Sequence, residues 1–158
     1  QVYLYKLHGS IDWKRDPDTK QLYRVEQTAT VEADEMELIF GREFKVEAAD
    51  PYLFYLYAFR DASYNAKLIV LVGYGFGDKH INSMLAQAMI NDRERRILVV
   101  GKCENEEEAK LRETVAKAIN ADPNRIIIYT QGAKTFLSDS KQGKKLQELV
   151  PKGDDVPF

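Results

Sequence analysis

The sequence predicts an α/β protein of the Rossmann-like class, with a three-layer arrangement in which a parallel sheet carries helices on both faces. Three apolar runs, at residues 68–72, 97–100 and 125–129, predict its strands. They lack the alternation of a half-exposed strand and suit strands buried on both faces. Helical apolar spacing separates the runs, and such β-α-β units are right-handed almost without exception.

The first stretch, residues 2–7, is apolar and aromatic and predicts a strand. His8, Gly9 and Ser10 follow it directly. The end of a strand is where open α/β sheets place active-site residues, although structural histidines also occur there. The chain starts at Gln1 without a preceding turn or cap, so we expect the N-terminal portion of the domain to be missing.

Residues 12–47 are expected to form an insertion. Asp16-Pro17-Asp18 is a turn signal, and residues 21–26 can return as the second arm of a hairpin. The segment has too little apolar content for a core of its own. We therefore expect one domain over residues 1–150 that carries this insertion, followed by a tail or linker at residues 151–158.

A helix is predicted from Pro51, because proline suits the first helical position. The aromatic-rich residues 52–59 indicate a helix that its neighbours largely cover. The strand at residues 68–72 follows this helix.

That strand ends in a glycine-rich turn. Asp78 comes next and suits a helix N-cap, because apolar residues recur at helical spacing after it. A strand, a glycine turn and a helix start form the junction at which α/β sheets bind phosphate-bearing ligands. Glycines also turn a chain without binding anything, and the spacing here matches neither the Gly-x-Gly-x-x-Gly fingerprint nor a P-loop. The turn consists of Gly73, Tyr74, Gly75, Phe76 and Gly77.

The second apolar strand ends in Gly101 and Lys102. Acidic residues at 104–108 suit the first turn of the next helix, which Pro123 is expected to stop. The third strand and a last amphipathic helix near residues 144–150 complete the predicted domain.

Composition limits the function classes. Lysine and arginine total 23 against 25 aspartate and glutamate, so nothing suggests direct nucleic-acid binding. The densest basic patch, residues 93–96, is interpreted as a solvated helix end. The single cysteine, Cys103, excludes internal disulfides and a Cys-rich zinc site. Without a signal peptide or an 18-residue apolar run, the sequence predicts a cytoplasmic protein with no membrane partner.

Two motifs resemble those of sirtuin-like domains. They are LHGSIDW at residues 7–13 and VLVGYGFGDKHIN at residues 70–82. The pair resembles in particular the zinc-free sirtuin-like group of bacterial antiphage-defence proteins, in which an "lHGsi" strand end and a "GYSfsDxxI" loop recur in this order. The resemblance covers about residues 2–130, and only these two motifs are specific.

The resemblance implies a role for each matching residue. His8 matches the catalytic histidine, and its neighbours Gly9 and Ser10 are expected to face the cofactor. Ser10 and Asp12 either hold the imidazole and line the pocket or are turn residues. The loop is expected to contact the phosphates and ribose of NAD. The residues after the next strand are expected to contact the adenosine ribose of NAD. These cofactor contacts comprise Gly73, Tyr74, Gly75, Phe76, Asp78, Gly101 and Lys102.

Within the loop, Asp78 is mainly a cap, and His80 is expected to be exposed. Two departures from the family pattern matter. Gly75 stands where the family usually has serine, so a hydroxyl contact to the cofactor is lost. The family's first phosphate loop and catalytic asparagine precede the histidine strand and have no match here, so we expect residues 1–158 alone to be inactive.

The implied function is an NAD+ hydrolase with His8 as general base. We expect it to cleave the nicotinamide–ribose bond in bacterial antiphage defence, as a homo-oligomer or in a larger assembly. The resemblance implies NAD as the substrate. Sirtuins proper carry a four-cysteine zinc module between the two motifs. Residues 14–47 contain no cysteine, so zinc is not expected. The alternatives are an NAD-dependent protein deacylase or ADP-ribosyltransferase, and a non-catalytic nucleotide-sensing or assembly module.

Overall fold

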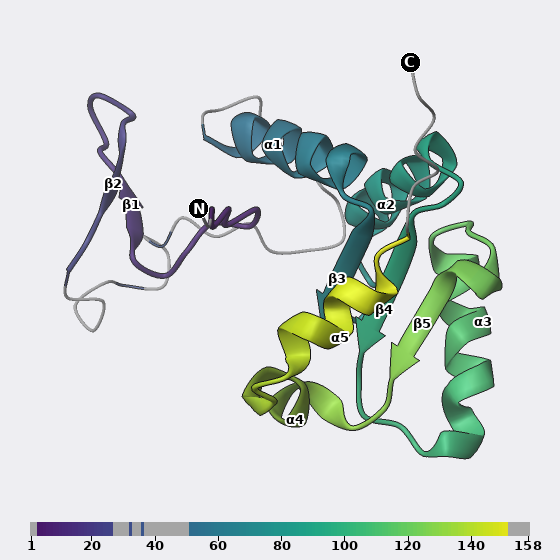
Figure 1. Cartoon of the computed structure of the whole chain (residues 1–158). Coiled ribbons are helices and arrows are strands. Elements are labelled where there is room, and N and C mark those ends of the chain that lie inside the picture. Colours follow the sequence, from purple (N-terminus) through teal and green to yellow (C-terminus); the bar gives the residue numbers. More distant parts are fainter. Residues whose placement is uncertain (1–2, 27–31, 33–35, 37–50, 152–158) are drawn as a thin grey trace. The chain divides into compact units, whose positions relative to one another are not determined.

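The computed structural model describes residues 3–26, 32, 36 and 51–151 (Figure 1). The chain separates into two compact units, Gln1–Phe59 and Arg60–Phe158. Most of the expected insertion after residue 26, and the expected tail beyond residue 151, lie outside the described residues. The domain boundaries expected from the sequence stay a prediction.

The C-terminal unit contains a three-stranded parallel sheet with the strand order β3-β4-β5. Its strands are β3 (Leu68–Val72), β4 (Arg96–Val100) and β5 (Ile126–Tyr129), which confirms the three predicted runs. The central strand is β4, and four of its five residues are buried. At the end of β3, Val72 is 40% exposed, because β3 has a neighbouring strand on only one side within the described sheet.

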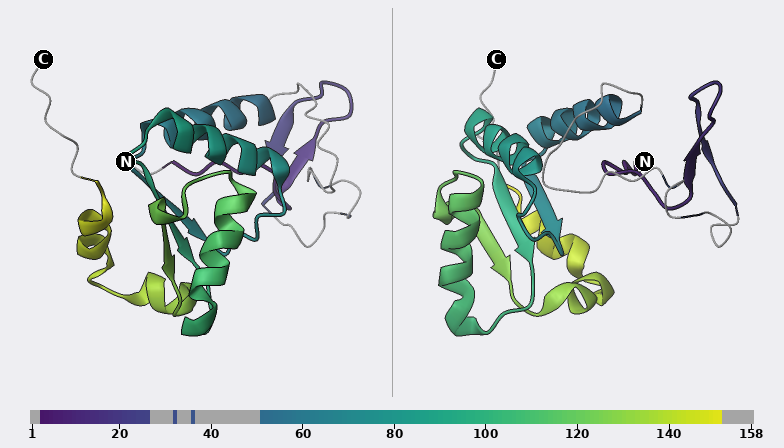
Figure 2. Two further views of the ribbon diagram at one scale, coloured as in Figure 1. Left: turned by 90° about the vertical axis from the view of Figure 1, so that its right-hand side faces the viewer. Right: turned by 180° about the vertical axis from the view of Figure 1, so that it is seen from behind.

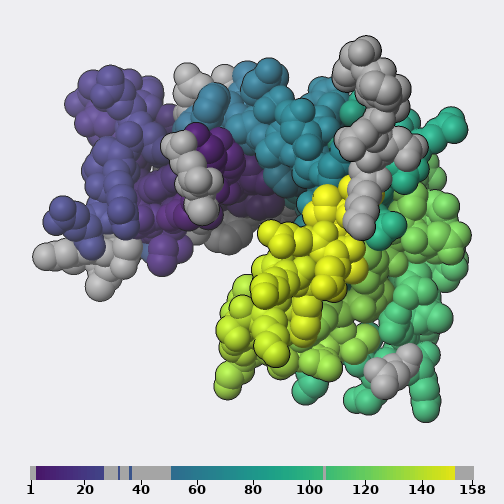
Figure 3. Space-filling view, viewed as in Figure 1, coloured from purple at the N-terminus to yellow at the C-terminus, as the bar shows by residue number. Residues whose placement is uncertain are grey.

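Helices cover both faces of this sheet, as the sequence predicted. The crossover helices α2 (Lys79–Asn91) and α3 (Glu108–Ala118) lie on one face (Figures 1 and 2). The helices α4 (Gly132–Ser138) and α5 (Gln142–Leu149) lie over the other face, which they cover in the space-filling view (Figure 3). The unit is therefore Rossmann-like, with three layers.

Successive residues of the central strand serve opposite faces, as the pleat requires. Leu98 and Val100 form a buried cluster with Phe136 of α4. Ile97 and Val99 point to the opposite face, which α2 and α3 cover, and both are buried. Burying one such side chain stabilises by about 1.5–3 kcal/mol, so these short strands owe their stability to the two helical layers.

The end of α3 differs from the prediction. The helix ends well before Pro123, at Ala118, and Asn120 just beyond the C-cap adopts a left-handed φ of 48°. The N–H of Ala121 donates to the carbonyl oxygen of Ala116 (3.0 Å), as in a Schellman motif. The prediction that Pro123 stops the helix is wrong, because asparagine tolerates this backbone conformation and ends the helix first. Pro123 instead begins the short 3-10 helix η3 (Pro123–Arg125); another, η2 (Asn105–Glu107), precedes α3.

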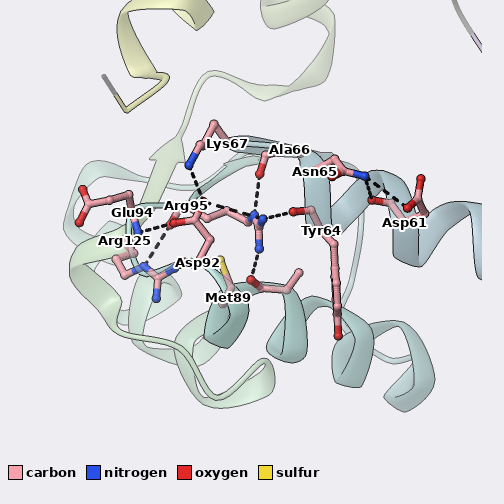
Figure 4. A network of polar contacts seen from close by, with 11 residues as sticks. Asp61, Tyr64, Asn65, Ala66, Lys67, Met89, Asp92, Glu94, Arg95 and Arg125 are labelled. Atoms are coloured by element: carbon pink, nitrogen blue, oxygen red, sulfur yellow. Dashed lines mark hydrogen bonds and ion pairs between the residues drawn. The ribbon is translucent and has the colours of Figure 1, made fainter. Parts of the chain in front are cut away.

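The basic patch at residues 93–96 is not wholly solvated. Arg95 is 1% exposed, and its guanidinium donates to the carbonyl oxygens of Ala66 (2.5 Å), Tyr64 and Ala88 (Figure 4). These carbonyls lie at the C-terminal ends of α1 and α2, where the last turn lacks intrahelical partners. Arg95 therefore joins two helix ends to the start of β4.

The N-terminal unit contains an antiparallel hairpin of β1 (Trp13–Arg15) and β2 (Leu22–Arg24). Asp16 Oδ1 accepts hydrogen bonds from the amides of Asp18 (3.0 Å) and Thr19 (2.7 Å), which confirms the predicted turn. The strand predicted at residues 2–7 is wrong for the described residues 3–7, which have no strand. A strand needs a hydrogen-bonded neighbour, and no described segment pairs with it.

Helix α1 (Tyr52–Asn65) begins after Pro51, as predicted. Its neighbours do not cover it as expected. Only Tyr52 and Leu56, one turn apart, are buried near its start, whereas three large apolar residues are more than half exposed. A continuous apolar sequence does not specify which stripe of a helix is covered. The exposed residues are Leu53, Phe54 and Tyr57.

No helix in the part of the chain that the structure describes is long and apolar enough to cross a membrane.

Candidate functional site

The glycine loop, residues 73–77, connects β3 to α2 at the carboxyl edge of the sheet. Gly73 adopts a φ of +67° and its N–H donates to the carbonyl oxygen of Val100 on β4 (3.4 Å). Phe76 also has a positive φ, +58°. A side chain at such a φ costs about 1–3 kcal/mol, so the turn requires glycine at Gly73 and needs compensating contacts around Phe76.

Side chains join this loop to the first turn of α2. The Tyr74 hydroxyl lies 2.8 Å from Asn82 Oδ1 and 3.1 Å from the carbonyl oxygen of Asp78. Asn82 Nδ2 donates to the carbonyl oxygen of Phe76 (2.9 Å). Burial first, and then the negative charge of Asp78, raises the pKa of Tyr74 to about 12, which keeps its hydroxyl a donor at neutral pH. The sequence alone had indicated no role for Asn82.

Asp78 is the predicted N-cap. Its Oδ1 accepts hydrogen bonds from the amides of His80 (2.8 Å) and Ile81 (3.0 Å), which confirms the cap. Two of the donors at the helix start are therefore occupied, and a carboxylate already interacts with the positive end of the helix dipole. A phosphate at this helix end would meet that carboxylate. His80, expected to be exposed, is partly buried.

Backbone donors remain available in the loop itself. The amides of Tyr74, Gly75, Phe76 and Gly77 donate no hydrogen bond to any residue that the structure describes. A Cβ added at Gly73, Gly75 or Gly77 would meet no atom within 4 Å. Unused amides beside open space are what a loop needs to hold an anionic or hydroxylated ligand through its backbone.

Gly101 and Lys102 follow the neighbouring strand at the same edge. Val72 pairs with Val100 in register, so the glycine loop and Gly101 begin side by side. The N–H of Gly101 donates to the carbonyl oxygen of Tyr129 (3.0 Å), and Lys102 is exposed. The structure thus brings together the predicted site residues that follow β3 and β4.

In the N-terminal unit, His8 lies in a turn and is exposed. The N–H of Gly9, which has a φ of +81°, donates to the carbonyl oxygen of Lys6 (3.1 Å). The N–H of Trp13 donates to the carbonyl oxygen of Ser10 (3.0 Å). The first of these turns contains the histidine, and the second follows it directly.

Asp12 anchors these turns to the hairpin. It is 8% exposed and accepts hydrogen bonds from Lys6 Nζ (3.1 Å) and Arg24 Nε (2.8 Å). Lys6 Nζ also donates to Ser10 Oγ (2.6 Å). Hydrogen bonds from Ser10 and Lys6 hold the pKa of Asp12 well below its usual range, so it stays ionised. These contacts tie Asp12 and Ser10 into the turns, and the expected contact of Ser10 with the cofactor stays a prediction.

The predicted site is divided between the units. His8, Gly9 and Ser10 belong to the N-terminal unit, and the glycine loop with Gly101 and Lys102 belongs to the C-terminal unit. Their convergence on one ligand stays a prediction. Within the described ranges, no three His, Cys, Asp or Glu side chains gather as metal ligands.

The C-terminal unit also carries a shallow, open hollow of about 310 Å³ that includes no predicted site residue. It lies beside the C-terminal ends of α1 and α2, whereas the glycine loop begins α2. The residues that line it are Tyr64, Gln87, Ile90 and Asn91.

The fold and the loop define a class: a Rossmann-like α/β domain with a strand, a glycine turn and a capped helix at the ligand-binding edge of its sheet. The chain matches the family model described as SIR2-like domain over residues 1–124, and it belongs to that family. The match confirms the resemblance to sirtuin-like domains, a family whose members are generally enzymes that use NAD. No curated protein matches the chain.

Proposed function

We propose that the protein is an NAD+ hydrolase that cleaves the nicotinamide–ribose bond and acts in bacterial antiphage defence. The observation that carries this proposal is the presence of both sirtuin-like motifs in a SIR2-like chain whose residues 14–47 contain no cysteine. Protein deacylation conventionally uses a peptide groove beside the zinc module that those cysteines would build. Hydrolysis of NAD needs only the dinucleotide and water.

The glycine loop supports the binding half of this proposal. The amides of residues 74–77 have no described partner and lie beside open space, so they fit the pyrophosphate or ribose of NAD. Because the Asp78 carboxylate occupies the start of α2, the phosphates would bind the loop amides rather than the helix end. Lys102, at the end of the adjacent strand, would add positive charge beside the adenosine ribose.

His8 would act as general base. In the proposed reaction the bond between ribose C1′ and the nicotinamide nitrogen breaks, and its electron pair leaves with nicotinamide. The oxygen of water bonds to C1′, and His8 accepts a proton from that water or from a ribose hydroxyl. The transition state has oxocarbenium character, so proton removal at this stage lowers its energy. The products are ADP-ribose, nicotinamide and one proton.

The test is His8→Ala in the full-length protein, with His80→Gln as the matched control at the only other histidine. We expect His8→Ala to lower the rate of NAD loss at least about 100-fold, because a general base typically contributes that much or more. Its thermal unfolding midpoint should not change, and His80→Gln should retain turnover. An unchanged rate in His8→Ala would remove this residue from the mechanism.

A product assay separates hydrolysis from deacylation. The full-length protein is incubated with NAD and an acetylated peptide, and the products are resolved by mass spectrometry. We expect free ADP-ribose and nicotinamide, formed at the same rate without the peptide. Peptide-dependent formation of O-acetyl-ADP-ribose would support the deacylase instead.

A non-catalytic nucleotide sensor is a second candidate. The presence of glycine at position 75, where the family usually has serine, favours this candidate. An added Cβ at Gly75 would meet no atom within 4 Å, and its φ is not positive, so Gly75→Ser is sterically tolerated. Calorimetric binding of NAD by the full-length protein, without loss of NAD over hours, would support the sensor.

A further inference from the structure

We infer that Asn82 is a positioning residue, which holds the glycine loop in the shape that receives the dinucleotide. This inference rests on the nucleotide-binding half of the proposed function. Asn82 is 8% exposed and lies on the first turns of α2, behind the loop rather than in it. It acts through the loop backbone and not by contact with the ligand.

Both ends of the Asn82 carboxamide are used. Nδ2 donates to the carbonyl oxygen of Phe76 (2.9 Å), and Oδ1 accepts from the hydroxyl of Tyr74 (2.8 Å). The orientation of the carboxamide is determined, because a backbone carbonyl only accepts and must face the amide nitrogen. A buried carboxamide that satisfies two partners on one loop fixes their separation.

One partner of Asn82 lies at an unfavourable backbone conformation in the loop. Phe76 has a φ of +58°, which a phenylalanine backbone rarely adopts, and its carbonyl is the group that Asn82 holds. The rings of Tyr74 and Phe76 pack at 4.8 Å on either side of Gly75 in the sequence. The Asn82 carboxamide and this ring pair thus both connect Tyr74 with Phe76 within the loop.

The consequence concerns the four loop amides. Those of residues 74–77 have no hydrogen-bond partner in the described structure, so no backbone ladder determines where they point. The side-chain network of Asn82 and Tyr74 supplies that order before the ligand arrives. A loop ordered in advance binds more tightly, because the entropy of ordering is not lost on binding.

Asn82→Asp provides the sharpest variant, since it keeps the size of the side chain and replaces the donor by an acceptor facing the Phe76 carbonyl. Tyr74→Phe leaves the carboxamide in place but removes the hydroxyl, which contacts Asn82 Oδ1 and the carbonyl oxygen of Asp78. Ser83→Ala is the matched control, because Ser83 is the next residue of α2 and is exposed. Each variant is made in the full-length protein, and calorimetry measures the affinity for ADP-ribose, an unreactive probe of the same site.

We expect Asn82→Asp to lower the affinity for ADP-ribose at least 10-fold and Tyr74→Phe to lower it about 3-fold or more. The affinity of Ser83→Ala should not change. The KM for NAD should rise by a similar factor in Asn82→Asp, while kcat at saturating NAD changes less than 3-fold. Hydrogen exchange of the unliganded protein should accelerate at residues 74–77 and not in β4. A merely structural role would lower the unfolding midpoint without this split between KM and kcat.

Affinity within twofold of wild type in both folded variants would overturn the role of Asn82 and leave the nucleotide site standing. If Asn82→Asp fails to fold, Tyr74→Phe decides in the same way. A wild-type protein that binds neither ADP-ribose nor NAD would overturn the nucleotide site and this inference together.

Discussion

Gly73 and Gly75 lie two positions apart in one loop, yet the backbone makes different demands on them. Gly73 has a φ of +67°, whereas Gly75 does not have a positive φ. Neither position is crowded, because an added Cβ would meet no atom within 4 Å at either. Any difference between substitutions at the two sites therefore measures backbone conformation alone.

We predict that Gly73→Ala lowers the free energy of unfolding by about 1–2 kcal/mol, because alanine is strained at this φ. Gly75→Ala, the matched control, should change it by less than about 0.5 kcal/mol. Urea denaturation of both variants measures the difference. Equal losses would show that the left-handed turn at Gly73 does not contribute to stability.

At the scale of elements, the ends of α1 and α2 and the start of β4 meet at one buried guanidinium. Arg95 donates to carbonyl oxygens at the end of α1 and within the last turn of α2, and it lies directly before β4. Arg125 adds a second bond, from its Nε to the carbonyl oxygen of Arg95 (3.0 Å), just before β5 (Figure 4). The amino edge of the sheet is thus closed by side chains, while its carboxyl edge carries the loop with unused amides.

We predict that Arg95→Met lowers the free energy of unfolding by about 3 kcal/mol or more. Each buried carbonyl that loses its donor costs about 1–3 kcal/mol, and three lose one here. Arg93→Met is the matched control in the same connection, because Arg93 is exposed and its loss should cost less than about 0.5 kcal/mol. Chemical denaturation measures both values, and similar losses in the two variants would contradict a role for the buried guanidinium.

At the scale of the whole molecule, the proposed reaction requires two units to serve one ligand. The histidine turn is fixed within the N-terminal unit by Lys6 and Asp12, and the loop is fixed within the C-terminal unit by Asn82. Each unit can thus present its motif in a defined conformation. In the proposed reaction, the general base would come from one unit and the phosphate contacts from the other.

We predict that NAD or ADP-ribose protects two separate segments of the full-length protein from hydrogen exchange. These are residues 7–10 around His8 and residues 73–77 of the loop, because one dinucleotide is expected to contact both. The hollow at Gln87 and Ile90 should show no change and serves as the internal control. Protection of the loop without residues 7–10 would separate His8 from the site.

The features that the sequence predicted well are local ones. The three strand runs, the Asp78 cap and the hairpin turn at Asp16 each depend on residues within a few positions of one another. The sequence also placed the loop and Gly101 at one edge, because parallel strands that follow β-α-β crossovers end on the same side. The resemblance to sirtuin-like domains came from two short motifs of the same local kind, and the family model matches residues 1–124.

The sequence by itself thus determined the Rossmann-like class, the glycine loop with its helix cap, and the SIR2-like family. Only the tertiary structure decided that Arg95 is buried, that Leu53 and Tyr57 are exposed, and that Asn82 holds the loop. The physical reason is distance along the chain: Arg95 meets Tyr64 across 31 positions, and no periodicity encodes such a partner. Backbone conformation follows from near neighbours, whereas burial and side-chain hydrogen bonding depend on which elements come to lie together.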